Sequence, residues 1–173
     1  MDFRNLQMAS RKGIAVTIAI LVGVAVFAYS LPFLIAFDTE MKITVSDFGK
    51  HLDITKERSA MEYSSIDESF EKLMENKMSS YEYIRIAEVS SSQINSLIVE
   101  LTNSGATQEW TEGYINYIGA LKKLNEKITE TIVVANLINS NDNSNAINEI
   151  IVKIHQLETE SFDLMEKADD ARP

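Results

Sequence analysis

The stretch from Gly13 to Phe37 constrains this chain more than any other feature of the sequence. It comprises 25 consecutive residues without a charged side chain. A helix that crosses the hydrocarbon core of a bilayer needs ~20 such residues. No later stretch is comparably long and apolar. The sequence therefore predicts one transmembrane helix over residues 13–37 and a polar remainder on one side of the membrane.

A cleaved signal peptide is the alternative interpretation of this stretch. Arg4, Arg11 and Lys12 provide a basic start, and Ala-Tyr-Ser at residues 28–30 resembles a small-residue cleavage site. The apolar core of a signal peptide is only ~7–15 residues long. Here the apolar run continues through residues 31–37, so cleavage would leave an apolar end on the mature protein. The sequence favours an uncleaved anchor over removal of residues 1–30.

The charges that flank the membrane segment predict its orientation. Residues 1–12 hold three basic side chains and one acidic one, Asp2, whereas the other flank begins with Asp38 and Glu40. Basic flanks favour the cytoplasmic side. We expect a cell-membrane protein with a cytoplasmic tail over 1–12, a transmembrane helix over 13–37, an extracytoplasmic helical domain over 38–168 and a frayed tail over 169–173.

Composition limits what the outer part of the chain can bind. The whole chain has 16 basic and 26 acidic residues. Without the cytoplasmic tail, 13 basic and 25 acidic residues remain, a net charge of −12 for residues 38–173. Such a domain repels nucleic acid and anionic lipid headgroups. The chain has no cysteine, which excludes disulfides, thiolate metal sites and cysteine nucleophiles.

Helical periodicity dominates the outer part of the chain, and short alternating runs typical of strands are missing. An apolar face that passes through Met41, Val45 and Phe48 predicts that the membrane helix extends to residue 52, with a break at 53–55. Capping-box patterns at Ser59 and Ser65 place the start of the next helix within residues 56–66. This second helix is expected to reach residue 103, with a kink near 78–80.

Two further helices are predicted after a glycine stop. Gly105 suits the left-handed position that follows a helix end. The next helix shows apolar residues at alternating spacings of 4 and 3 over residues 110–138, and small polar residues at 139–145 predict a loop. A last helix follows over residues 147–164. Helices with such spacing pack as a left-handed antiparallel bundle, so we expect an all-α, three- or four-helix bundle, whose fourth member would be the extended membrane helix.

Chemistry-bearing residues are sparse. Di-iron bundles use Glu-x-x-His on two helices, and neither histidine follows a glutamate at that spacing. Asp47 with His51, and His155 with Glu158, each share a helical face and are weak metal candidates. The alternative is a surface histidine beside a carboxylate. No catalytic residue, metal or cofactor is predicted.

Two groups of residues are candidates for packing or partner contacts. Trp110, Tyr114 and Tyr117 lie on one helical face, either as bundle core or as a patch for a partner or ligand, because Tyr and Trp are favoured at interfaces. In the membrane segment, three small residues lie at i, i+4 and i+8: Ala15, Ala19 and Gly23. Small residues permit close approach of helices in lipid, although they are also common in membrane helices generally.

The order of a basic tail (1–12), one membrane helix (13–37) and a helical outer domain (38–168) resembles two kinds of protein. One is the single-pass accessory subunit of membrane enzyme complexes, such as the extra subunits of archaeal ammonia monooxygenase. The other is the four-helix sensor ectodomain of chemoreceptors. The first resemblance implies a non-catalytic accessory or scaffold subunit that contacts membrane subunits or itself, and the second implies a tethered ligand-sensing or solute-capturing domain.

Overall fold

The computed structural model describes residues 45–140 and 144–173. The tail 1–12, the predicted transmembrane helix 13–37 and its small residues Ala15, Ala19 and Gly23 lie outside the described residues. In the part that is described, no helix has the length and apolarity needed to cross a membrane. The described residues form four helices and no strand, which confirms the all-α prediction.

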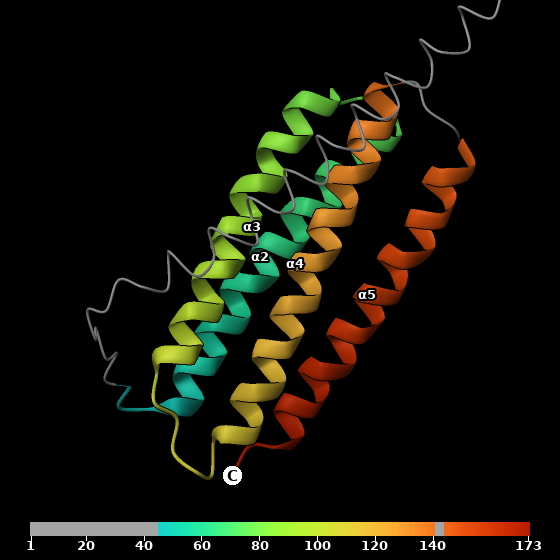
Figure 1. Cartoon of the computed structure of the whole chain (residues 1–173). Coiled ribbons are helices and arrows are strands. Elements are labelled where there is room, and N and C mark those ends of the chain that lie inside the picture. Colours follow the sequence, from blue (N-terminus) through green and yellow to red (C-terminus); the bar gives the residue numbers. More distant parts are fainter. Residues whose placement is uncertain (1–44, 141–143) are drawn as a thin grey trace, which may run out of the picture. The chain divides into compact units, whose positions relative to one another are not determined.

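The four helices pack side by side as a bundle in which consecutive helices run in opposite directions (Figure 1). Their bounds are α2 Phe48–Met74, α3 Ser80–Asn103, α4 Thr111–Asn139 and α5 Ser144–Asp170. α4 packs against each of the other three helices, while α2 packs against α3 and α4. The fourth member of the bundle is α2, which is a separate helix and not the predicted extension of the membrane helix.

The start of α2 corrects the predicted extension of the membrane helix to residue 52. Asp47 has extended backbone angles, φ −141° and ψ 101°, and its side chain accepts a hydrogen bond from the Lys50 N–H. An N-cap of this kind begins a helix, so Val45 and Ser46 precede α2 rather than belong to it. The predicted break at 53–55 is also wrong. The helix runs through it, and the buried Thr55 hydroxyl bonds back to the His51 carbonyl.

The link between α2 and α3 replaces the predicted kink with a true turn at residues 75–79. Asn76 adopts a left-handed φ of 58°, and the Lys77 N–H reaches back to the Lys72 carbonyl at 2.8 Å. This is the hydrogen-bond pattern of a Schellman ending. Ser79 then caps α3 by accepting from the Glu82 N–H. The capping patterns at Ser59 and Ser65 lie inside α2, so the predicted helix start within residues 56–66 is wrong. A four-residue capping pattern is local, and it can occur within a helix whose buried face continues through it.

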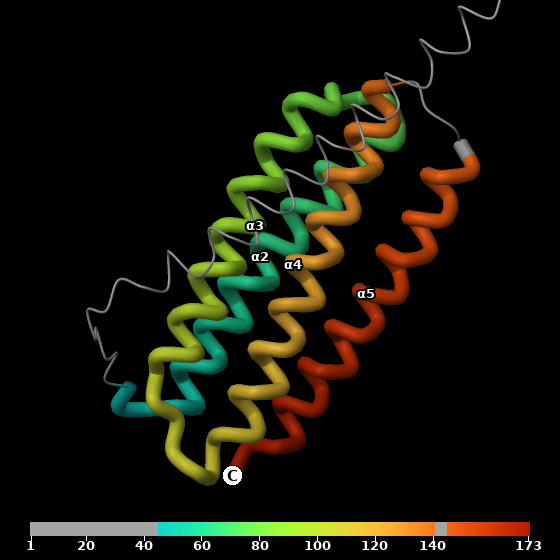
Figure 2. The backbone as a smooth tube through the Cα atoms, viewed as in Figure 1, coloured from blue at the N-terminus to red at the C-terminus, as the bar shows by residue number. Residues whose placement is uncertain are grey.

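Other turns follow the sequence closely. Gly105 has φ 63° just after α3 ends at Asn103, as predicted for a glycine stop. The first turn of α2, the link between α3 and α4, and the C-terminal residues lie at one end of the bundle (Figure 2). At that end the predicted frayed tail differs from the structure. Asp169 and Asp170 close α5, and the Arg172 guanidinium donates to Asp53 at 2.7 Å.

The core is apolar along the middle of the bundle, and α4 contributes the most to it. The largest fully buried side chains are Tyr83, Tyr117, Leu52, Ile66, Leu73, Ile94, Leu97, Leu101, Leu121, Leu124, Ile128 and Val134. Small polar residues are buried among them, and most of their hydroxyls are hydrogen-bonded, namely those of Thr55, Ser59, Ser104, Thr131 and Ser161. Ser161 of α5, for example, donates to the Ala120 carbonyl of α4 at 2.9 Å. Such small residues let helices approach closely while the large ones fill the interior.

Candidate functional site

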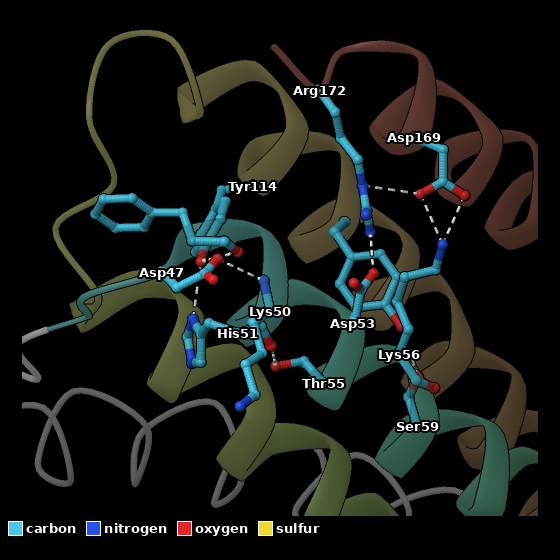
Figure 3. A network of polar contacts seen from close by, with 12 residues as sticks. Asp47, Lys50, His51, Asp53, Thr55, Lys56, Ser59, Tyr114, Asp169 and Arg172 are labelled. Atoms are coloured by element: carbon cyan, nitrogen blue, oxygen red, sulfur yellow. Dashed lines mark hydrogen bonds and ion pairs between the residues drawn. The ribbon is translucent and has the colours of Figure 1, made fainter.

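A polar cluster joins three helices at the end of the bundle where α2 begins. We call His51, Arg58, Glu100 and Tyr114 the His51 cluster. His51 Nδ1 lies 2.8 Å from the Tyr114 hydroxyl, and Nε2 lies 3.0 Å from Glu100 Oε1 (Figure 3 shows His51 and Tyr114). Arg58 donates to the other oxygen of Glu100 at 2.8 Å. Because a carboxylate only accepts, His51 Nε2 carries a hydrogen in its contact with Glu100.

Burial and hydrogen bonding act in opposite directions on the acid groups of this cluster. Burial alone would raise the pKa of Glu100, but hydrogen bonds from Arg58 and His51 outweigh it and lower that pKa. Burial raises the pKa of Tyr114 to about 12. Glu100 is therefore held as an anion. The Tyr114 hydroxyl keeps its single proton and donates it to the Phe48 carbonyl at 3.1 Å.

Asp47 does not belong to the His51 cluster, although the sequence groups the two residues as a weak metal pair. Its carboxylate caps α2 through the Lys50 N–H. The partners of His51 are instead Glu100 on α3 and Tyr114 on α4. No set of three or more side chains that could hold a metal ion occurs among residues 45–140 and 144–173.

The aromatic side chains next to the cluster close the same end of the bundle. Phe48 packs edge-on against Tyr114 with ring centroids 5.9 Å apart, and its ring lies 6.4 Å from that of Trp110. A Cβ added at Gly49 would lie 3.1 Å from the Trp110 ring, so the glycine makes room for the indole. Tyr117 is fully buried deeper in the bundle, where its hydroxyl meets Ser59 at 2.6 Å.

The structure thus separates the three aromatic candidates. Tyr114 and Tyr117 are buried, which matches the bundle-core interpretation for these two residues. Trp110 is partly buried against the core.

A second polar cluster lies in the middle of the bundle, and sequence reasoning missed its central residue. We call Lys127, Asp67, Glu158 and Tyr63 the Lys127 cluster. The Lys127 side chain is only 4% exposed and donates to Asp67 and to Glu158, each at 2.7 Å. Its ammonium lies 4.3 Å from the centre of the Tyr63 ring. A signal existed, since Lys127 follows the core residue Leu124 by three positions and precedes the buried Thr131 by four, which places all three on one helical face.

Glu158 belongs both to the Lys127 cluster and to the His155–Glu158 pair that the sequence suggests as a weak metal candidate. Burial would raise its pKa, but hydrogen bonds from Lys127 and Tyr63 outweigh burial and lower it. His155 Nδ1 lies 3.6 Å from Glu158 Oε2, and its side chain is 71% exposed. The predicted pair is therefore adjacent, but Glu158 is committed mainly to the buried ammonium of Lys127.

Burial of the tyrosines predicts a loss of stability in alkali. Burial raises the pKa of Tyr114 and of Tyr117 to about 12, and it raises the pKa of Tyr63 and Tyr83 as well. A raised folded-state pKa gives stability that is complete below the unfolded value near ~10 and is lost as pH rises through the folded value. We expect the urea midpoint to fall between pH 10 and 12, together with a rise in tyrosinate absorbance. A midpoint that stays constant over this range would contradict the burial of these hydroxyls.

Comparison with known proteins gives no relative for this chain. No protein-family model, no curated protein and no solved structure matches it.

Proposed function

We propose that this protein is a non-catalytic, single-pass accessory or scaffold subunit of a membrane protein complex. Residues 13–37 would dock on partner subunits within the membrane. The acidic helical bundle would lie outside the cytoplasm and cover or support those partners. The proposal combines the apolar segment and its basic flank with the way the bundle uses its charged groups.

The observation that best supports this function is that charged side chains of the bundle form contacts between helices. His51 engages both ring nitrogens and Glu100 both carboxylate oxygens in contacts between helices. The buried ammonium of Lys127 is shared between carboxylates of α2 and α5. Groups that elsewhere serve acid–base chemistry here join helices to one another, as expected of a domain with a structural role.

The membrane helix offers the sharpest test of the accessory role. Ala19→Leu with Gly23→Leu fills the small-residue face and raises hydrophobicity, so insertion should persist while close helix packing is lost. We expect the double variant to separate from its partner subunits, or from itself, in mild detergent. Insertion is checked with Thr107→Cys, at an exposed residue of the α3–α4 link, which should react with an impermeant thiol reagent on intact cells.

A matched control adds similar bulk elsewhere on the membrane helix. In the proposed membrane helix, at 100° per residue, Ala25 and Ala28 would lie on a different face from Ala19, so Ala25→Leu with Ala28→Leu should keep the partners bound. Mass spectrometry of the solubilised protein identifies what remains attached. If the Ala19/Gly23 variant keeps its partners at wild-type stoichiometry, or if only a small ligand co-purifies, the accessory-subunit proposal fails.

A further inference from the structure

The contact between α2 and α5 differs from the other contacts of the bundle. No Cα atom of α2 lies within 8 Å of one in α5 among the described residues, although α4 packs closely against both helices. We define the α2–α5 interface by the side chains that bridge this gap, which are Asp53, Lys56, Tyr63, Asp67, Lys127, Glu158, Phe162, Asp169 and Arg172. Most of them are charged, whereas the other interfaces of the bundle contain the apolar core.

One part of the α2–α5 interface lies at the end of the bundle. Lys56 donates to both oxygens of Asp169, at 2.6 and 2.7 Å, and Arg172 donates to Asp53 at 2.7 Å (Figure 3). Asp53 is well exposed. Ion pairs of this kind contribute little in water and are weakened by salt. These two ion pairs therefore contribute little to holding α5 against α2.

The second part lies in the middle of the interface, where the Lys127 side chain is buried and its carboxylate partners Asp67 and Glu158 are 40% and 23% exposed. Lys127 projects from α4 between Asp67 of α2 and Glu158 of α5, and its ammonium is compensated by these two carboxylates. The Tyr63 hydroxyl donates to Glu158, and the Tyr63 ring packs edge-on against Phe162. His155 also faces Glu158 but is mostly in water. A buried ammonium is tolerated only while its partners remain charged, because an unpaired buried charge is costly.

We propose that the α2–α5 interface is a releasable joint, closed by the charges of Lys127, Asp67 and Glu158, that opens in acid while α3 and α4 stay packed. Protonation of the two carboxylates leaves the Lys127 ammonium buried without a counter-charge. The shortest way to rehydrate it is to part α2 from α5, since these helices share no close backbone packing. The inference does not depend on the proposed membrane function.

The lowered pKa of Glu158 supports the direction of this pH dependence. Its pKa is lowered in the folded protein, chiefly because the hydrogen bonds from Lys127 and Tyr63 outweigh burial. A lowered folded-state pKa gives stability that is present above the unfolded value and lost as pH falls through the folded value. Opening is therefore expected on the acid side of the ordinary carboxyl pKa, near ~4.

Spin labels on α2 and α5 can measure the opening directly. The chain has no native cysteine, and Ala60 and Thr159 are exposed positions on the two helices. Labels at Ala60→Cys and Thr159→Cys in the full-length protein should give a narrow distance distribution at neutral pH. As pH falls, the distribution should broaden before helical circular dichroism declines. If broadening and loss of helix coincide, the joint does not open on its own and the proposal is wrong.

Charge variants separate the electrostatic cause from simple loss of packing. Lys127→Met leaves Asp67 and Glu158 facing each other without a cation, so the distance distribution should broaden at neutral pH. Adding Asp67→Asn and Glu158→Gln removes that repulsion, and the triple variant should return to the narrow distribution and stop responding to acid. A narrow distribution in the single variant, or an equally broad one in the triple variant, would overturn the proposal.

Discussion

Leu124→Asp is expected to lower the free energy of unfolding of the bundle by about 5 kcal/mol. Leu124 lies in the middle of α4 and is 1% exposed. The substitution removes buried apolar contacts and places an unpaired carboxylate in the core, and both effects are destabilising. Small domains are stable by only about 5–15 kcal/mol, so much of the protein should unfold. Urea unfolding followed by far-ultraviolet circular dichroism measures the change.

Ile115→Asp is the matched control for this prediction. It makes a similar aliphatic-to-aspartate change on the same helix, at a residue that is 62% exposed. Exposed substitutions of this kind usually change stability by no more than ~0.5 kcal/mol. If the two variants unfold at the same urea concentration, the face of α4 that carries Leu124 is not the one packed against the other helices, which contradicts the bundle described above.

Tyr117→Ala is expected to cost about 4 kcal/mol. Tyr117 is 0% exposed, and its hydroxyl meets Ser59 of α2 at 2.6 Å. Truncation leaves a large cavity between α4 and α2, and loss of a buried aromatic ring typically costs about 3–5 kcal/mol. Tyr117→Phe keeps the ring and removes only the hydrogen bond, which should cost about 1 kcal/mol.

The pair of variants at Tyr117 also decides between the two interpretations of the aromatic face. A core tyrosine gives a large loss in the alanine variant and a small one in the phenylalanine variant, both read from the urea midpoint. If both variants retain wild-type stability, the side chain is not part of the core, and the interpretation of this face as a partner or ligand patch regains support.

Local patterns predicted much of the fold. The 4-and-3 spacing along residues 110–138 gave α4 to within one residue at either end, because a helix that buries one face must repeat its apolar residues with the helical period. Gly105 marked the end of α3, since a left-handed φ is costly for other residues. The same reasoning misplaced the start of α2. The face through Val45 and Phe48 keeps its spacing across a cap at Asp47 that periodicity cannot detect.

The sequence by itself determined that the part of this chain that the structure describes is a helical bundle, because helix formation and amphipathicity depend on residues a few positions apart. Only the tertiary structure decided what the polar residues do. His51 meets Glu100 across 49 residues of sequence, and Lys56 meets Asp169 across 113. A carboxylate such as Glu158 has the same sequence pattern whether it faces water or a buried ammonium. Its role is fixed only when α4 brings Lys127 between α2 and α5.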